Sequence, residues 1–420
     1  MKQYIAIDLG ASSGRIMLFD SDGTYRECSR FDTVKCHCSG RLCWDHVHIW
    51  ESIRQGLLDL AAELSSPPCG ISCDSWAQDT VLLDNSGGVL TNPVCYLDGQ
   101  LKGASLRLEK LGLNGFADIH TVCQLTVQPE NIIKNCAYLL HIADYVNYQL
   151  SGVPRGNYSM YSVGKLLDSA GDLNRELLDK LDIPTAIFPE VCSEQIIGTL
   201  DNSWPDILQN VPVISGISHD TAAAFYSLAP QKNEAAVIFG TWLMCGVLQD
   251  VAEPLPQFGK VMGINYQYSA RHASAPGLWA FNQCVEAWKK QGVFPGFAEF
   301  DAAVNASDYS GSFQAAWSDK PLLPEDVAKS LLEQGFSLPQ TLGDYGRALN
   351  SGMLKHLEKA LESLQTFDRS LTGLVIGGGG IKNAPLMAML KQKLPLNCRC
   401  GNAEASAWGN VLAQIHTLNA

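Results

Sequence analysis

The pattern of apolar and polar positions predicts a chain of alternating strands and helices that opens with a hairpin. Apolar residues fill most of 4–9 and 16–19, and the small residues of 10–14 between them predict a tight turn joining two strands. Apolar positions recur at helical spacing over 47–64, which predicts a helix. Further strands are expected at 70–76, 80–83, 212–215 and 374–377, and further helices at 175–181, 278–291 and 345–364 and from Glu404. This alternation is typical of an α/β fold.

Three stretches have a weaker pattern. Residues 25–44 alternate enough to predict further antiparallel strand. Residues 153–189 are rich in tyrosine and are expected to be irregular outside the helix near 175. Residues 294–342 are rich in proline, glycine and acidic residues, and we assign no helix or strand to this stretch.

A second hairpin pattern aligns with the first without a gap. Residues 235–250 repeat the order of strand, glycine turn and strand, with Gly240 in the position of Gly10 and Asp250 in that of Asp20. We interpret this as a weak internal repeat, which predicts two domains built on one plan. The boundary is expected between residues 228 and 229.

Composition restricts the classes of partner. A chain of 420 residues with 46% hydrophobic and 17% charged residues is typical of a soluble globular protein of two domains. A net charge of −13 argues against nucleic acid or an anionic membrane as the main partner. The chain shows neither a secretory signal pattern nor an apolar run of roughly 18 residues. Its fourteen scattered cysteines are therefore expected to be reduced thiols in a cytoplasm.

The opening turn is a candidate phosphate site. Small residues at 10–14 let the backbone approach a ligand, and successive N–H groups in such a turn can bind an anion. Asp8 lies at the end of the first strand, where a carboxylate can hold a divalent cation against phosphate oxygens. An ordinary hairpin with a solvated Asp is the alternative.

Two further turns are candidates for chemistry. The strand at 212–215 leads into His219, Asp220 and Thr221, and a helix is expected to begin at once, so that its N-terminal N–H groups favour an ionised Asp220. Taken alone, a Ser-His-Asp-Thr run is more often a helix cap than the site of a catalytic base. The strand at 374–377 runs into a four-glycine turn, where a nucleotide can lie against bare backbone.

A cluster of thiols and imidazoles suggests zinc, but its spacing does not fit. The cluster comprises Cys36, His37, Cys38, Cys43, His46 and His48. It has no paired Cys-x-x-Cys knuckles, so packing of a strand is expected rather than a metal site. Cys398 and Cys400 are likewise expected to be strand residues.

Five motifs in order resemble the FGGY carbohydrate kinases, and the rhamnulokinase branch is the most similar. The motifs are Asp8-Leu9-Gly10-Ala11-Ser12-Ser13-Gly14-Arg15, Ser218-His219-Asp220-Thr221-Ala222, Gly240-Thr241-Trp242, Gly378-Gly379-Gly380 and Glu404-Ala405-Ser406-Ala407-Trp408-Gly409-Asn410. The resemblance covers nearly the whole chain. It implies an actin-like ATPase (ribonuclease H-like) fold of two domains, each around a mixed five-stranded sheet with flanking helices. It also implies that 1–228 binds sugar and phosphate and that 229–420 binds nucleotide.

The resemblance also implies roles for single residues in transfer of a phosphoryl group from ATP with Mg²⁺. Asp220 would be the base that accepts the proton of the sugar hydroxyl, and Asp8 would lie at the metal. The residues implied for the nucleotide are Ala11, Ser12, Ser13, Gly14, Arg15, Gly240, Thr241, Asn282, Gly378, Gly379 and Gly380. Those implied for the sugar are Trp76, Ala77, Asp79, His219 and Thr221.

The chain departs from the rhamnulokinase pattern near the expected ligands. Ala77 replaces a Gly, Leu97 replaces the Arg of a Tyr-Arg-Asp triplet, Ser274 replaces an Asn, and Asn282 replaces a Gln. A rhamnulose-like ketose is the expected substrate. Fuculose, xylulose or ribulose remain alternatives, as does an actin-like protein that binds sugar or nucleotide without catalysis. A homodimer is left open as an assembly.

Overall fold

The computed structural model describes residues 2–251, 260–316, 318, 320–367 and 370–420. The chain forms two compact units. Unit 1 comprises 1–227, 262–269 and 406–420, and unit 2 comprises 228–261 and 270–405. Two segments of the second half of the sequence thus belong to the first unit.

Unit 1 is built on a six-stranded mixed sheet. Its strands, in spatial order, are β12 (Gln195–Thr199), β13 (Pro212–Ser215), β6 (Ile71–Ser75), β1 (Gln3–Leu9), β2 (Ser13–Asp20) and β3 (Tyr25–Asp32). The strands β1, β6 and β13 are parallel neighbours, whereas β1, β2 and β3 form an antiparallel meander. The carboxyl ends of the three parallel strands therefore meet at one edge of the sheet.

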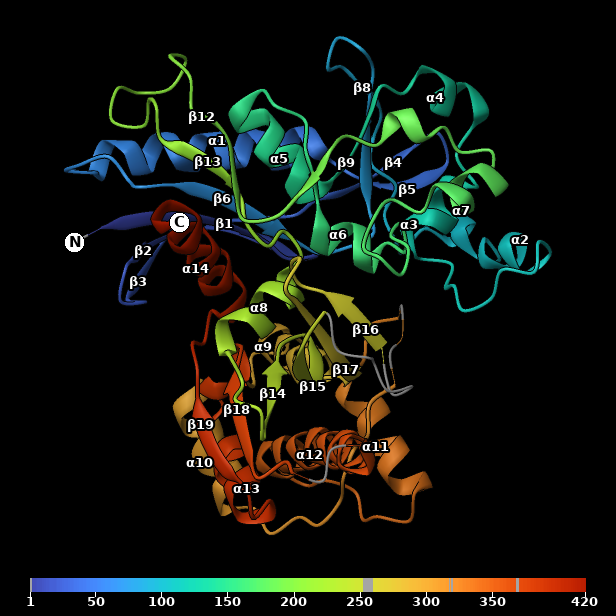
Figure 1. The fold of residues 1–420 in the computed structure, drawn as a ribbon. Coiled ribbons are helices and arrows are strands. Elements are labelled where there is room, and N and C mark those ends of the chain that lie inside the picture. Colours follow the sequence, from blue (N-terminus) through green and yellow to red (C-terminus); the bar gives the residue numbers. More distant parts are fainter. Residues whose placement is uncertain (1, 252–259, 317, 319, 368–369) are drawn as a thin grey trace. The chain divides into compact units, whose positions relative to one another are not determined.

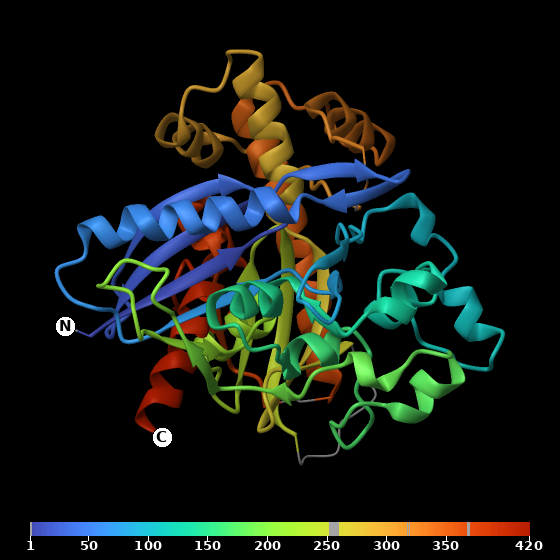
Figure 2. The ribbon, with the colours of Figure 1, turned by 90° about the horizontal axis from the view of Figure 1, so that it is seen from above.

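Helices cover both faces of this sheet because the side chains of β1 alternate between two cores. Ile5 and Ile7 join the larger core, to which α1 (His46–Glu63) and α5 (Ile142–Ser151) contribute. Tyr4 and Ala6 pack on the opposite face against α14 (Ala405–Asn419). Figures 1 and 2 show α1 lying along the first face, and Figure 1 shows α14 on the other. The period of two along a strand thus gives the layers.

Smaller elements of unit 1 surround one end of the sheet. The strands are β4 (Lys35–Cys38), β5 (Arg41–Trp44), β7 (Thr80–Leu83), β8 (Val89–Thr91), β9 (Tyr138–His141), β10 (Gly156–Asn157) and β11 (Val191–Cys192). The helices are η1 (Gly99–Leu101), α2 (Ser105–Glu109), α3 (Thr121–Leu125), α4 (Glu130–Asn135), α6 (Tyr158–Val163), α7 (Arg175–Lys180) and η2 (Thr185–Ile187), and α8 (Asp220–Leu228) follows β13.

The sheet of the second half repeats the plan of the first. Its strands, in spatial order, are β16 (Lys260–Gly263), β17 (Tyr268–Pro276), β15 (Trp242–Asp250), β14 (Glu234–Phe239), β18 (Gly373–Gly377) and β19 (Asn397–Cys400). The antiparallel pair β14–β15 takes the place of β1–β2, and β18 lies parallel to β14 as β6 lies parallel to β1. Helices α12 (Leu342–Phe367) and α13 (Ala384–Lys393) pack on one face, and η3 (Gly379–Lys382) precedes α13.

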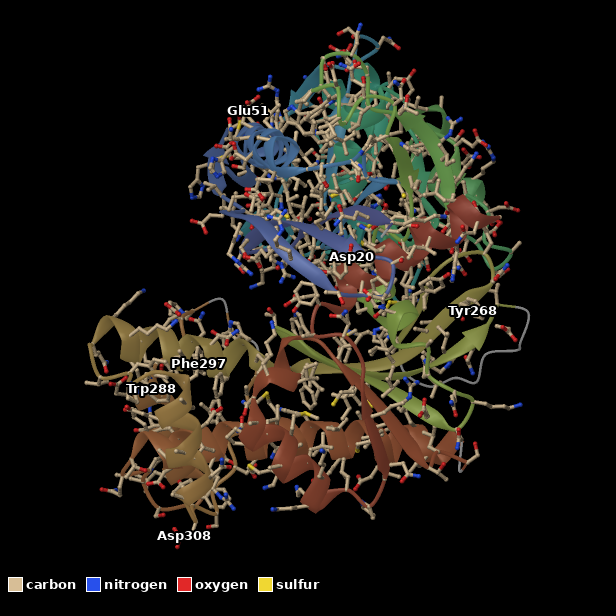
Figure 3. The ribbon with its side chains drawn as sticks, turned by 90° about the vertical axis from the view of Figure 1, so that its left-hand side faces the viewer. Asp20, Glu51, Tyr268, Trp288, Phe297 and Asp308 are labelled. Atoms are coloured by element: carbon tan, nitrogen blue, oxygen red, sulfur yellow. The ribbon has the colours of Figure 1, made fainter. Side chains whose placement is uncertain are left out.

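An aromatic cluster joins three outer helices of unit 2 to α12. These helices are α9 (Leu278–Lys290), α10 (Phe297–Ala306) and α11 (Pro324–Glu333). The rings of Trp288 and Phe300 have centroids 5.7 Å apart. Figure 3 shows Trp288 and Phe297 in this group of helices. None of the helices in the described ranges is long and apolar enough to cross a bilayer.

The structure confirms the α/β fold, both hairpins and the main helices, and it corrects three expectations. Each sheet has one edge strand more than the five expected, β12 in one and β16 in the other. The stretch 294–342 contains α10 and α11. The stretch 153–189 contains α6, which Asn157 caps by accepting from the Ser159 N–H at 3.0 Å.

Candidate active site

The carboxyl ends of β1, β6 and β13 bring several predicted residues together in unit 1. Asp8 lies near the end of β1, Trp76 follows β6, and His219 and Asp220 follow β13. The loops after β6 and β13 are joined, because the Ser75 N–H donates to Ser218 O at 2.8 Å. The strand ends that carry the predicted catalytic residues are therefore neighbours at one edge of this sheet.

The phosphate turn, residues 10–14, connects β1 to β2. The Gly10 N–H donates to Ser13 O at 2.9 Å and closes the turn. A Cβ on Gly14 would lie 2.4 Å from the Phe31 ring, so a side chain at this position would displace it. Arg15 lies opposite Asp8 in the sheet register, and its guanidinium forms an ion pair with the Asp8 carboxylate. Arg15 thereby brings a cation to the end of the turn.

Three carboxylates lie close enough to interact at this edge. Asp74 is the β6 neighbour of Asp8 in the sheet register and is fully buried. Burial raises the pKa of Asp74 well above its usual value, and the Asp8 charge adds to the rise, whereas a hydrogen bond from Asn410 opposes it. The Asn410 Nδ2 donates to Asp74 Oδ2 at 2.8 Å, while Oδ1 has no partner among the described residues.

Asp220 is the first residue of α8, and the pKa of its carboxyl group is raised. Burial, with a contribution from the Asp8 charge, raises its pKa to about 7. The Thr221 N–H and hydroxyl both donate to Asp220 Oδ1, and they oppose the rise only in part. The N–H groups at the helix start therefore favour the ionised form, as expected, but burial and the Asp8 charge outweigh them and bring the pKa close to neutral pH.

His219 and Thr221 flank this carboxylate. His219 Nε2 lies 3.5 Å from Asp220 Oδ1, and the side chain of Asp220 remains 30% exposed. The His219 N–H donates to Ser159 Oγ at 3.0 Å, which fixes the backbone before the helix. A group approaching Asp220 from solvent would meet an imidazole and a hydroxyl beside it.

An indole pair, Trp44 and Trp76, lies behind the loop that follows β6. Their ring centroids are 4.2 Å apart, and both Nε1–H groups donate to Asp79 Oδ2, at 2.6 Å and 3.1 Å. Asp79 also accepts from the Tyr96 N–H at 3.1 Å and from Gln124 Nε2 at 2.9 Å. It is fully buried, and burial raises its pKa to about 6. Asp79 therefore orients the indole pair, and Ala77 lies half-buried in the same loop.

Unit 2 contains a second set of predicted residues around the turn between β14 and β15. The Leu278 N–H donates to Gly240 O at 2.8 Å, and the Gly277 N–H donates to Thr241 O at 3.0 Å. These bonds anchor the start of α9 to the turn. Thr241 is exposed, and so is Asn282 in the second turn of α9.

The glycines at 378–380 differ in their surroundings. A Cβ on Gly378 would lie 2.8 Å from Phe239 O, and one on Gly380 would lie 2.2 Å from Phe239 Cβ. A Cβ on Gly379 would meet only Leu278, at 4.0 Å, and Gly379 is exposed whereas the other two are buried. The outer glycines thus permit close packing on β14, and the middle one presents bare backbone.

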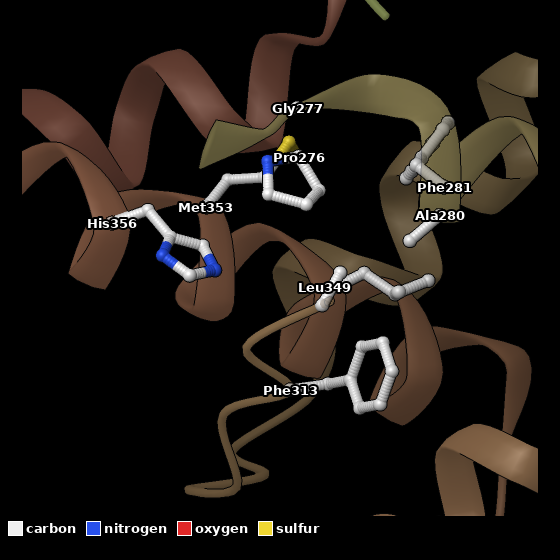
Figure 4. Close-up of a pocket in the computed structure, with 9 residues that line it drawn as sticks. Pro276, Gly277, Ala280, Phe281, Phe313, Leu349, Met353 and His356 are labelled. Atoms are coloured by element: carbon white, nitrogen blue, oxygen red, sulfur yellow. The ribbon is translucent and has the colours of Figure 1, made fainter. Parts of the chain in front are cut away.

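Unit 2 also contains a small cavity between the start of α9 and α12 (Figure 4). Its lining includes Pro276 and Gly277, just before α9, and Met353 and His356 of α12. Its volume of about 10 Å³ admits no more than a water molecule. The cavity is therefore a small void in the packing of this region and is too small for a ligand of nucleotide size.

Sequence reasoning missed the polar residues that hold the loops. Asn157 Nδ2 donates to Gly216 O at 2.8 Å, and its Oδ1 caps α6, so that one side chain ties α6 to the loop before Asp220. Asn410, from α14, reaches Asp74 across 336 residues of sequence. Asn157 ends β10 and directly precedes α6, where an Asn is a usable cap signal, whereas nothing local indicates the partner of Asn410.

The cluster of thiols and imidazoles lies largely on a hairpin. Cys36 on β4 is directly opposite Cys43 on β5, and Cys38 is opposite Arg41. His46 and His48 belong to the first turn of α1. Among the residues that the structure describes, no group of three or more His, Cys, Asp or Glu side chains is placed to hold a metal. Cys398 and Cys400 lie on β19, so the expectation of strand residues there is confirmed.

Comparison with known proteins relates the chain to a family of kinases. The model of the FGGY family of carbohydrate kinases, N-terminal domain, matches residues 3–226. A rhamnulokinase of Yersinia pestis (strain Pestoides F) is 28% identical over 449 aligned positions, which cover 99% of this chain and 90% of the relative. A ligand-bound xylulose kinase from Lactobacillus acidophilus superposes with a TM-score of 0.80 at 14% identity, covering 100% of this chain and 90% of the other. A glycerol kinase from Plasmodium falciparum with ADP gives 0.73 at 14%, with the same coverage.

Proposed function

Because the chain belongs to the FGGY family of carbohydrate kinases, and is thus a sugar phosphotransferase, we propose that it transfers the γ-phosphoryl group of ATP to a hydroxyl of a rhamnulose-like ketose. The observation that carries the proposal is the meeting of Asp8, His219 and Asp220 at adjoining strand ends of one sheet. Phosphoryl transfer requires a positioned hydroxyl, stabilised phosphate charge and one proton acceptor.

Asp220 is the proposed base. Its carboxylate is buried enough for a raised pKa of about 7 and still 30% exposed, so it can both meet a sugar hydroxyl and accept its proton near neutral pH. The Thr221 hydroxyl donates to it at 3.0 Å and holds its orientation. His219, beside Asp220, is proposed to contact the sugar.

The phosphate turn and Asp8 are proposed to receive the phosphate end of ATP with Mg²⁺. The residues fit that ion, because Asp8 supplies a carboxylate and Asp74 Oδ1 is a buried oxygen without a hydrogen-bond partner in the described chain. Mg²⁺ commonly takes one or two carboxylates and completes its shell with phosphate oxygens and water. When bound, it would neutralise charge on the transferring phosphoryl group. Arg15, at the end of the turn, would contact the same phosphates.

The remaining nucleotide contacts are proposed for unit 2. Thr241 is exposed at the turn after β14, where its hydroxyl can donate to a phosphate oxygen. Gly379 presents backbone with open space before it, which suits a flat nucleotide group. Asn282, exposed on α9 at the position of a family Gln, would contact the nucleotide as well.

A rhamnulose-like ketose is the proposed sugar, supported by similarity to a rhamnulokinase over 99% of this chain. The identity of 28% and the replacements at Ala77 and Leu97 leave fuculose, xylulose and ribulose as the competing substrates. In this chain the carboxylate of Asp98 pairs with Arg41 from β5 at 2.6 Å, so a cation still faces it although residue 97 is Leu. The indole pair and its loop are retained around Ala77.

The experiment is a panel of ketoses, aldoses and polyols incubated with ATP and Mg²⁺, with ADP release measured against the background in water alone. Rhamnulose should give the highest kcat/KM, and NMR of the product should identify the phosphorylated hydroxyl. A higher kcat/KM with another ketose would correct the substrate and keep the reaction. Sugar or nucleotide binding by calorimetry without ADP release from any compound would favour a non-catalytic binding protein.

A further inference from the structure

Three consecutive carbonyls of the phosphate turn accept hydrogen bonds from one short segment, residues 33–35. Thr33 Oγ1 donates to Gly10 O at 2.9 Å, and the Thr33 N–H donates to Ser12 O at 3.3 Å. Between them, Lys35 Nζ donates to Ala11 O at 3.2 Å. Because a trans peptide is planar, fixing the Ala11 carbonyl also fixes the Ser12 N–H, which points the opposite way.

Lys35 has a second contact, on the hairpin of β4 and β5. The antiparallel register places Lys35 directly opposite Trp44, and Nζ lies 4.4 Å from the centroid of the indole ring. Trp44 is fully buried, so the ammonium covers a ring face that has little water around it. A cation over an indole is attracted most strongly where both are desolvated.

Trp44 also contacts the loop after β6, which is predicted to bind the sugar. Its Nε1–H donates to Asp79, which also accepts from Trp76, and the two indole rings are 4.2 Å apart. Trp76 is also tied to the end of β1, because its N–H donates to Leu9 O at 3.2 Å. An unbroken series of contacts therefore joins the Ala11 carbonyl to Trp76 by way of Lys35 and Trp44.

We propose that Lys35 is a positioning residue that couples the phosphate turn to the indole pair. Its ammonium orients the amide groups of the turn and holds the Trp44 ring in place. Binding of phosphate at the turn and binding of sugar at the loop after β6 should therefore each raise the affinity for the other. The inference rests on the proposed function in two respects, namely that the turn receives the ATP phosphates and that the loop around Trp76 contacts the sugar. An ammonium suits both contacts, since it donates to a carbonyl and attracts an indole face, whereas a neutral side chain can at best make the first.

The test compares Lys35→Met and Lys35→Arg with the wild type. Met keeps the length and apolar stem of Lys35 but has neither charge nor donor, whereas Arg keeps both. Lys134→Met is the matched control, because Lys134 is 70% exposed on α4 and pairs only with Glu130 in the described structure. The probes are MgADP affinity by calorimetry, the near-ultraviolet circular dichroism of the indole pair, and sugar affinity with and without MgADP.

Lys35→Met should weaken MgADP binding by about 5- to 50-fold, the range expected when one N–H of the turn loses its alignment on a charged phosphate. It should also change the dichroism of the indoles and remove most of the difference in sugar affinity that MgADP produces. Lys35→Arg should restore the dichroism and most of the coupling. Lys134→Met should match the wild type throughout.

Two results would overturn the proposal. Weaker MgADP binding with unchanged dichroism and coupling would make Lys35 a plain phosphate ligand, and behaviour like Lys134→Met would make it a surface charge. If Lys35→Met does not fold, Lys35→Gln takes its place, since it keeps a donor for Ala11 without the charge and should retain nucleotide affinity while losing the indole signal. MgADP binding and dichroism need no turnover, so failure of the sugar panel would remain distinguishable from failure of this inference.

Discussion

Asp220 should be the residue whose loss most affects turnover. Asp220→Asn keeps shape and the acceptor for Thr221 but cannot take a proton, so kcat should fall by roughly 10²–10⁴. MgADP affinity should change little, because the proposed phosphate contacts lie elsewhere. Steady-state kinetics with the best sugar and calorimetry with MgADP measure the two effects.

Asp59→Asn, on an exposed part of α1, is the control for that substitution and should leave kcat unchanged. Near-normal turnover of Asp220→Asn would reduce Asp220 to a helix cap. The base would then have to be sought among Asp74, Asp79 and Asp98, of which Asp79 already accepts four donors and Asp98 is paired with Arg41.

Asp79 should make stability depend on pH in an unusual direction. Its folded pKa of about 6 lies above the unfolded value of about 3.9, so the folded state holds the proton more tightly. The contribution of Asp79 to stability is therefore full below about pH 4 and is lost as pH rises through about 6, by about 3 kcal/mol. The free energy of unfolding of the wild type minus that of Asp79→Asn should fall by this amount between pH 4 and pH 7.

Denaturant titrations of the two proteins at several pH values measure that difference. Asp84→Asn is the control of opposite sign, because Asp84 is only partly buried and hydrogen bonds from Ser86 and Gly88 lower its pKa, so its stability difference should not fall as pH rises. A difference for Asp79→Asn that stays constant with pH would show that Asp79 keeps its charge through the whole range.

Two neighbouring glycines should respond to substitution in opposite ways. Gly379→Val adds its side chain where only Leu278 lies near, at 4.0 Å, so the protein should fold and lose MgADP affinity. Gly380→Ala places a Cβ 2.2 Å from Phe239 Cβ and should cost about 1–3 kcal/mol of stability. Thermal melts and calorimetry separate the two, and normal nucleotide binding by Gly379→Val would remove the glycine turn from the proposed site.

At the scale of elements, the β4–β5 hairpin should not bind zinc, so the purified protein should contain no stoichiometric zinc. Zinc needs three or four ligands around one point, whereas Cys36 and Cys43 face each other across the hairpin and His46 and His48 lie on the separate helix α1. Elemental analysis of protein prepared without added metal should find well below one zinc per chain. About one zinc per chain, lost in Cys36→Ser, would contradict this expectation.

The hairpins were predictable from sequence because one face of each strand is buried and a glycine turn joins them. The helices α10 and α11 were not, since proline and acidic residues in 294–342 resemble a loop. In α11 those residues are the helix start, with Pro324 in the first turn and Asp326 Oδ2 accepting from the Leu323 N–H at 3.0 Å. The same composition thus serves a loop or a helix N-terminus, and the apolar Val327 and Leu331 decide between them.

Within the candidate site, the sequence indicated the residues at the ends of strands. It did not indicate the residues from other segments that hold these strand ends in position. Asp8 and Asp220 follow strand patterns, and the family resemblance assigned their roles. Lys35 and Asn410 act through contacts with distant segments, and neither belongs to a local pattern of residue types. The raised pKa of Asp220 also depends on burial and on Asp8, which only the folded unit brings near.

At the scale of the whole molecule, unit 1 should not be stable as the fragment 1–228. This fragment lacks α14, so Tyr4, Ala6, Met17 and Phe19 would lose the helix that covers them. It also lacks Gln414, whose Nε2 donates to Ile5 O at 2.9 Å. The fragment should aggregate, whereas the same fragment joined to 404–420 by a flexible linker should be more soluble. Equal solubility and equal melting temperatures of the two would show that α14 is dispensable.

The return of α14 to the first sheet has a consequence for synthesis on the ribosome. The nascent chain completes β1 and β2 within its first 20 residues, but the helix that covers Tyr4 and Phe19 emerges only after unit 2. At usual rates, translation of the roughly 190 residues after 228 takes roughly 10–40 s. During that interval the apolar face of the sheet is open to other nascent chains, so the yield of native protein should depend on holdase chaperones, and should rise when translation of the second half is faster.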